Sequence, residues 1–214
     1  MILYDDDCWE LYPNLRNYFD KYWIAKIQGL KCGDSSVPVL ETGFYCVRPV
    51  VNLHGMSKDT RFQFLEKGDI IEDGFFWCEY LHGNQYSIDY KKDKSGNRTV
   101  HLAVEANIEL KTKLRTPYKF KAWHRLSNHD YIKFPFPEIL KEEKLKEVEI
   151  INVEYIGNTI IEVHLRGNPD FEGHDYNTLW VAWETDTPED TDGWTFIADE
   201  DHSGVEKRLG FYCK

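Results

Sequence analysis

The sequence lacks several features that would assign it to a class directly. Only 2 of its 214 residues are methionine, and no apolar run approaches the roughly 20 residues that a membrane-spanning helix needs. The first residues, Met1 to Asp7, turn acidic at once, unlike the basic and then apolar start of a signal peptide. The sequence therefore predicts a cytoplasmic protein without membrane contact, in the host cytoplasm if the chain is viral.

Basic residues are also in deficit. The chain has 26 Lys and Arg against 37 Asp and Glu, a formal net charge of −11. Contact with a phosphate backbone needs a basic face, so this balance excludes a general nucleic-acid binder, although a local basic pocket stays compatible with it. Asp5 to Asp7 are expected to form a solvated acidic terminus.

Cysteine is present but not in a metal-binding or redox spacing. The 5 cysteines are widely separated and form no C-x-x-C pair, which excludes a zinc ribbon and a thioredoxin-type dithiol. We expect reduced thiols that act as small hydrophobes.

Aromatic residues are abundant, at 15% of the chain, which excludes a disordered protein. The length suits one large domain or two small ones. Hydrophobic spacing predicts one or two helices within 9–30 and a helix over 137–146 that begins at a proline. Period-two patterns between turn residues predict strands within 37–51, 75–104, 147–165, 179–183, 194–198 and 209–213. These elements indicate a mixed α+β fold with mostly antiparallel pairing.

The first candidate site is a strand that ends in a cation. The extended segment 43–51 contains Arg48, and a loop with Gly55 follows. A guanidinium beside a glycine-bearing loop can hold phosphate oxygens. An edge-strand arginine in a surface ion pair is the alternative interpretation.

The second candidate site is the connection after the strand 75–81. This strand delivers Glu79 to a short connection whose exposed backbone can read the edge of a nucleobase, while the carboxylate accepts ribose hydroxyls. An ordinary β-hairpin is the alternative.

The third candidate site is the hairpin 147–165. Glu162, His164 and Arg166 alternate with apolar residues, so they share one face. Glu154 shares this face if the hairpin has a three-residue loop with a bulge; with a strict two-residue loop it does not, and Asn152 comes forward instead. Two carboxylates and an imidazole on one face form a candidate Mg²⁺ site. A solvated face with cross-strand ion pairs is the alternative.

In this order, the three segments resemble the ATP-grasp superfamily of carboxylate-activating ligases over roughly residues 20–170. The N-terminal part also fits, since Asp20-Lys21 is similar to the Asp-Lys helix of the family. Arg48 replaces the lysine of its Val-Lys-Pro strand. His164 replaces the metal-binding asparagine of its closing Glu-x-Asn-x-Arg strand, and the glycine-rich loop 52–56 keeps only Gly55.

The resemblance implies an α+β, ATP-grasp-like fold of two small α+β lobes with mostly antiparallel sheets. It divides the chain into four parts: an N-terminal helical segment at 1–36, the small lobe and hinge at 37–90, the large lobe with the metal-binding hairpin at 91–170, and an aromatic and acidic extension at 171–214.

The function implied by the resemblance is an ATP- and Mg²⁺-dependent ligase. It would activate a small-molecule or peptide carboxylate as an acyl-phosphate for attack by an amine. The implied ATP-binding residues are Arg48, Glu79 and Leu81. The implied metal ligands are Glu154, Glu162 and His164. Arg166 would be the catalytic residue that stabilises the transferred phosphoryl group.

The sequence does not predict the oligomeric state.

Two other functions remain open. One is a non-catalytic binding or assembly protein, of viral origin or not, whose core is a degenerate ATP-grasp-like or an unrelated α+β fold. Trp180, Trp183 and Trp194 would then be interface anchors, although core packing is the favoured explanation of them. The other is a metal-dependent hydrolase, which the absence of H-x-x-x-H spacing disfavours.

Overall fold

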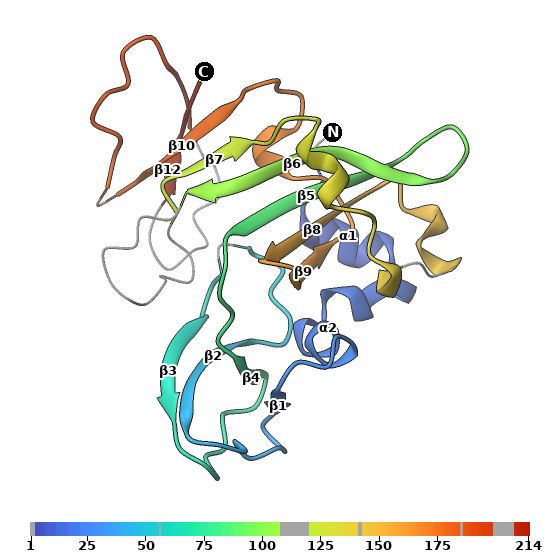
Figure 1. The fold of residues 1–214 in the computed structure, drawn as a ribbon, viewed down its shortest axis with the longest axis vertical. Helices are drawn as coiled ribbons and strands as arrows, with labels where there is room; N and C mark the ends of the chain where they lie inside the picture. Colours follow the sequence, from blue (N-terminus) through green and yellow to red (C-terminus); the bar gives the residue numbers. More distant parts are fainter. Residues whose placement is uncertain (1–2, 56, 108–119, 141–142, 185, 199–207) are drawn as a thin grey trace.

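The computed structural model describes residues 3–55, 57–107, 120–140, 143–184, 186–198 and 208–214. Its strands form two antiparallel sheets that lie at opposite ends of the molecule (Figure 1). The predicted α+β architecture with two lobes is confirmed. Residue 56 of the predicted glycine-rich loop lies outside the described residues.

The smaller lobe is built on a four-stranded sheet in the order β1-β4-β2-β3. Its apolar core contains Val47, Phe76 and Trp77, all almost fully buried. The segment around Arg48 is strand β2, as predicted from its extended pattern. The strands are β1 (Cys32–Asp34), β2 (Gly43–Pro49), β3 (Arg61–Leu65) and β4 (Phe75–Glu79).

The larger lobe is built on an eight-stranded sheet in the order β11-β12-β10-β7-β6-β5-β8-β9. Strands predicted near 85–90, 99–104, 147–165, 179–183, 194–198 and 209–213 all belong to it. The strands are β5 (Gln85–Lys92), β6 (Arg98–Asn107), β7 (Ala122–Arg125), β8 (Ile150–Ile156), β9 (Thr159–His164), β10 (Thr178–Trp183), β11 (Thr195–Ala198) and β12 (Arg208–Cys213).

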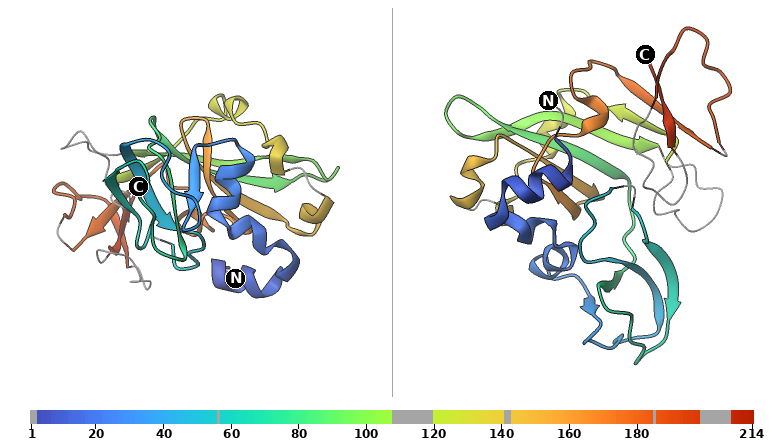
Figure 2. Two further views of the ribbon diagram at one scale, coloured as in Figure 1. Left: turned by 90° about the horizontal axis from the view of Figure 1, so that it is seen from below. Right: turned by 180° about the vertical axis from the view of Figure 1, so that it is seen from behind.

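The N-terminal helices lie beside both sheets, as the view from behind shows (Figure 2). Helix α2 contacts β9 of the large sheet and β1 of the small sheet, so it joins the two lobes. The helices are α1 (Asp5–Leu11), the 3₁₀ helix η1 (Pro13–Phe19) and α2 (Lys21–Ile27). The first of them begins before the predicted range 9–30.

The predicted α-helix over 137–146 is wrong for the residues that the structure describes. They form the short 3₁₀ helices η3 (Glu138–Leu140) and η4 (Glu143–Glu147). Leu140, Leu145 and Val148 are nevertheless buried against the large sheet, so the apolar spacing reflects core packing and not a continuous helix. Two further 3₁₀ helices are η2 (Asp130–Lys133) and η5 (Pro169–Phe171).

The hairpin β8–β9 contains the bulge on which the position of Glu154 depends. Glu154 lies opposite Glu162, while Tyr155 lies opposite Ile160, so Ile161 is an extra residue in β9. Glu154 therefore shares the face of Glu162, as predicted for a bulged hairpin, but the loop has two residues and not three, since Ile156 pairs with Thr159 and the bulge lies within β9. The alternative in which Asn152 replaces Glu154 does not occur. Asn152 lies opposite His164 and shares the face with Glu154, because residues two apart on one strand point to the same side.

Two other features follow from the described residues. All five cysteines are free, and Cys8, Cys78 and Cys213 are buried. No helix among the described residues is long and apolar enough to cross a bilayer.

Candidate functional site

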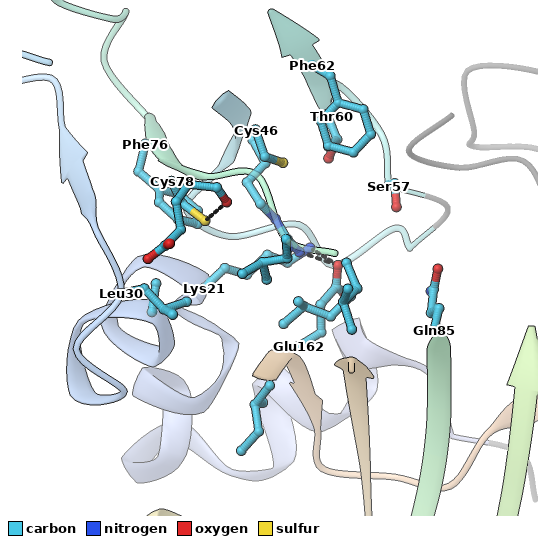
Figure 3. A pocket seen from close by; sticks show the side chains of 17 residues that line it. Lys21, Leu30, Cys46, Ser57, Thr60, Phe62, Phe76, Cys78, Gln85 and Glu162 are labelled. Carbon is cyan, nitrogen blue, oxygen red and sulfur yellow. Dashed lines mark hydrogen bonds and ion pairs between the residues drawn. The ribbon is translucent and has the colours of Figure 1, made fainter. Parts of the chain in front are cut away.

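The two lobes meet at a pocket formed by α2, β2, β4 and β9 (Figure 3). Arg48, Glu79, Leu81 and Glu162 all line it, so the structure brings four of the predicted site residues together. Lys21 also lines the pocket, and sequence reasoning assigned it no role. In this arrangement the free volume is only about 50 Å³, because the side chains of the two lobes reach across to one another.

Helix α2 places Lys21 at its first position, beside the large sheet. The Asp20 carboxylate caps the helix by accepting a hydrogen bond from the Trp23 N–H at 2.7 Å. At the other end, the Gln28 amide bonds both the N–H and the C=O of Ile160, each at 2.8 Å. These contacts fix α2 against β9 and bring the Lys21 ammonium next to Glu162.

Glu162 joins the lobes through two buried ion pairs. Its Oε1 lies 2.9 Å from Lys21 Nζ and also accepts a hydrogen bond from Arg48 Nη2. All three residues are buried, at 6–8% exposure. Burial alone would raise the pKa of Glu162, but the two cations outweigh it and lower the pKa to about 2. Arg48 is therefore neither at the surface nor free: it is held by a carboxylate from the opposite lobe.

The predicted hinge residues lie farther along β4, at the other end of the pocket: Arg48 pairs with Phe76, and Glu79 is three residues beyond Phe76. Glu79 is the last residue of β4, and its Oε1 accepts a hydrogen bond from the Lys31 N–H at 2.8 Å. The Glu79 N–H in turn donates to the Lys31 C=O at 2.9 Å. Leu81 follows in the connection to β5 and also lines the pocket. One oxygen of Glu79 is thus committed to the backbone of residue 31.

His164 and Arg166 are both held by Asp5, which the sequence analysis placed in a solvated acidic terminus. Asp5 is buried at 2% exposure, not solvated, and its carboxylate accepts from His164 Nδ1 at 2.9–3.0 Å and from Arg166 Nη2 at 2.8 Å. Burial would lower the pKa of His164, but Asp5 raises it to about 9. No pattern signals this contact, because 159 residues separate Asp5 from His164.

The predicted metal ligands do not fit Mg²⁺. His164 Nε2 lies between the two carboxylates, 3.8 Å from Glu154 Oε1 and 3.6 Å from Glu162 Oε2. Mg²⁺ needs oxygen ligands in near-octahedral geometry, and a protonated imidazole cannot supply one. Among the residues that the structure describes, no group of three or more His, Cys, Asp or Glu side chains is arranged to hold a metal ion.

A second polar network lies on the same sheet face. Asn152 Nδ2 donates to Ser87 Oγ and to Asp89 Oδ1, each at 2.8 Å, and the Asn168 N–H donates to Asp89 at 3.0 Å. Burial raises the pKa of Asp89 to about 6, although these hydrogen bonds oppose the shift.

A second cavity, of about 540 Å³, is lined by Asp89, Asn168 and Arg166. Its volume lies within the range of roughly 300–1,000 Å³ that small-molecule sites occupy. Arg166 therefore faces a space large enough for a small substrate, whereas Glu162 faces the pocket between the lobes.

Comparison with known proteins adds the fold family to this geometry. No protein-family model and no curated protein sequence matches the chain. Solved structures do match. An N5-carboxyaminoimidazole ribonucleotide synthetase in an ADP complex aligns with a TM-score of 0.55 and 9% identity, covering 93% of this chain and 67% of that chain.

Two further enzymes described as N5-carboxyaminoimidazole synthases or synthetases match similarly. The Staphylococcus aureus ADP complex has a TM-score of 0.54 and 10% identity, covering 94% of this chain and 68% of that chain. The Aspergillus clavatus complex with ADP and 5-aminoimidazole ribonucleotide has a TM-score of 0.53 and 8% identity, covering 94% and 69%.

A protein from Archaeoglobus fulgidus described as belonging to the ATP-grasp superfamily matches at a TM-score of 0.48, and the chain spans 64% of its length. The three matches with TM-scores of 0.53–0.55 show that the chain shares the overall fold of those enzymes. The chain has an ATP-grasp-like fold, in a form whose sequence has diverged widely from the proteins that share it.

Proposed function

We propose that this chain binds an adenine nucleotide in the pocket between its lobes and uses it to activate a carboxylate. The observation that carries the proposal is the meeting of Lys21 and Arg48 in that pocket, with Glu79 and Leu81 at its other end. Cations at one end, and a carboxylate with an apolar side chain at the other, match the phosphates and the nucleoside of a nucleotide. Three structural neighbours described as ADP complexes support the same ligand.

The phosphates would occupy the end with Lys21 and Arg48. Both cations are now held by Glu162, so the phosphates must exchange with this carboxylate. The guanidinium can bind two phosphate oxygens at once, while the ammonium acts as a point charge. The purine would lie against Leu81, with the ribose hydroxyls near the free oxygen of Glu79.

The reaction that we propose is a carboxylate–amine ligation. A carboxylate oxygen attacks the γ-phosphorus, the bond to ADP breaks, and an acyl-phosphate forms. An amine then attacks the acyl carbon and phosphate leaves. Arg166 lines the second cavity, where the carboxylate would bind, and once Asp5 releases it, it would stabilise the charge on the group transferred from the pocket. Magnesium has no part in this proposal, because the residues present do not fit it.

A non-catalytic nucleotide-binding protein is the second candidate, and one observation favours it. Asp5 already holds Arg166 at 2.8 Å and is itself buried, so a carboxylate of the chain competes with any substrate for this side chain. Under this alternative, ATP binds but no ADP forms.

Thermal unfolding with added ATP tests the proposal. A ligand that binds only the folded state, present at 100 times its Kd, raises the free energy of unfolding by about 2.7 kcal/mol. For a chain of this size that is a rise in Tm of roughly 5–10 °C. Lys21→Met should lose the shift, whereas Lys133→Met should keep it, since Lys133 is an exposed cation paired with Asp130. An unchanged Tm for the wild-type chain would refute nucleotide binding.

ADP formation separates the two candidates. A ligase releases ADP only when its carboxylate is present, so incubation of the wild-type chain with ATP and pools of amino acids or peptides should give ADP in some pools and none without them. Binding of ATP with no ADP in any pool favours the non-catalytic protein.

A further inference from the structure

The charged side chains around Glu162 and Asp5 leave no surplus negative charge for a metal ion. Even before the imidazole of His164 is counted, three carboxylates, those of Asp5, Glu154 and Glu162, face three cationic side chains, those of Lys21, Arg48 and Arg166. A divalent cation added to this group would bring two positive charges that no further carboxylate offsets.

The carboxylates are also oriented toward these partners. Glu162 Oε1 contacts both Lys21 and Arg48, and its Oε2 faces His164. Glu154 Oε2 accepts a hydrogen bond from Gln85 at 3.3 Å, and its Oε1 faces the same imidazole. Each carboxylate that could bind a metal ion thus has both oxygens directed at groups of the protein.

His164 is fixed in this position from its other side. Asp5 accepts the hydrogen bond of Nδ1 with both of its oxygens, and Asp5 is anchored in turn by Arg166. Because the ring is held at Nδ1, Nε2 remains directed at Glu154 and Glu162. A metal ion shared by these two carboxylates would have to displace the ring.

We infer that the pocket binds its nucleotide without a divalent cation: Lys21 and Arg48 turn from Glu162 to the phosphates, and His164 stays between Glu154 and Glu162 in place of a metal ion. This inference rests on the proposed nucleotide binding. It predicts that free ATP, and not its magnesium complex, is the form that the site selects.

Calorimetric titration of the wild-type chain with ATP tests it, once in excess EDTA and once in excess Mg²⁺. The expected Kd in EDTA is equal to that in Mg²⁺ within about threefold, or tighter. A Kd at least about tenfold tighter in Mg²⁺ would overturn the inference and leave the proposed function standing. No binding under either condition would overturn the proposed function, and the inference with it.

His164→Asn makes the test specific to the imidazole. The variant removes the ring from between the carboxylates and offers an amide oxygen instead, so its ATP affinity should become about tenfold tighter in Mg²⁺ than in EDTA. The matched control Lys133→Met should behave like the wild-type chain. A folded His164→Asn protein with no Mg²⁺ dependence would show that this histidine does not replace the metal. If the variant does not fold, the wild-type titrations decide alone.

Discussion

Glu162 is the side chain at which the two lobes meet, and its removal should be costly. Glu162→Gln leaves Lys21 and Arg48 buried without their carboxylate, so we expect the free energy of unfolding to fall by about 3–5 kcal/mol. Denaturation in urea measures this. The matched control is Glu41→Gln, whose carboxylate pairs with Lys31 at the surface and should contribute nothing measurable.

The double variant tests whether the loss comes from the pairing. Arg48→Met with Glu162→Gln removes a cation and an anion together, so its cost should be smaller than the sum of the two single variants by about 0.5–3 kcal/mol. Additive losses would mean that the two side chains are not coupled.

Asp89 should make stability depend on pH in the acid range. Its pKa is about 6 in the folded chain, whereas an Asp in the unfolded chain has a pKa of about 3.9. Between these values the folded state binds more protons than the unfolded state, so this group's contribution to stability falls as the pH rises from about 4 to about 6, and stays low above it.

Asp89→Asn removes that titration. The free energy of unfolding of the variant minus that of the wild-type chain should therefore increase from about pH 4 to about pH 6 and then level off. Urea denaturation across this range measures the difference. A difference that is independent of pH would contradict the raised pKa.

At the residue scale, sequence reasoning predicted several residues of the candidate site that the structure brings together. Arg48, Glu79, Leu81 and Glu162 stand in motifs whose order is recognisable, and the structure places all four at one pocket. Asp5 was out of reach because its partners lie at the far end of the chain. In the sequence, an acidic run at a terminus that is solvated cannot be told from one in which a carboxylate pairs with a buried arginine.

At the scale of elements, a single extra residue decides which side chains face the pocket. Ile161 bulges from β9, and through it Glu162 comes opposite Glu154. Without a bulge, a two-residue turn would place Glu162 opposite Val153, because strand faces alternate at every residue. The sequence allowed both registers, since apolar residues flank the turn on each side.

The small sheet depends on a close approach at Gly33. A Cβ at this position would lie 2.8 Å from three atoms of the buried Trp77 indole, whose Nε1 also donates to the Val37 C=O at 3.0 Å. We expect Gly33→Ala to lower the free energy of unfolding by about 1–3 kcal/mol and to alter tryptophan fluorescence. In Gly43→Ala, the nearest atom is 3.6 Å away, on Tyr45, so this variant should be tolerated. Equal stability of the two variants would contradict the packing argument.

Helix prediction failed where apolar spacing had a different cause. Residues 137–146 have helical periodicity, yet their buried members sit on short 3₁₀ turns that fit the contour of the large sheet. Tertiary packing selects such turns, and local propensity cannot foresee them. The N-terminal helices were predicted in part: η1 and α2 lie within 9–30, whereas α1 begins at Asp5, before that range.

At the scale of the whole molecule, the strands among the described residues of 171–214 belong to the large sheet. Strands β10 and β12 continue it beyond β7, and Leu179 and Phe211 share a core cluster with Leu102 and Val104 of β6. Trp183 is 1% exposed, so it packs in the core. Trp180 and Trp194 stack on each other, with their ring centroids 4.8 Å apart.

Truncation tests how far the chain depends on this part. A protein ending at residue 170 would expose the apolar side of β6 and β7, so we expect it to aggregate or to lose cooperative unfolding. Size-exclusion chromatography and thermal unfolding would detect both. A monomeric truncated protein with the Tm of the full chain would instead make 171–214 a dispensable extension.

The most direct test of the account is a crystal structure of the chain grown with a non-hydrolysable ATP analogue. We predict electron density for the polyphosphate at Lys21 and Arg48, with Glu162 released from both, and for the purine beside Leu81 and Glu79. Ordered analogue elsewhere, or a pocket in which Glu162 keeps both ion pairs at saturating analogue, would contradict the proposal that this pocket binds a nucleotide.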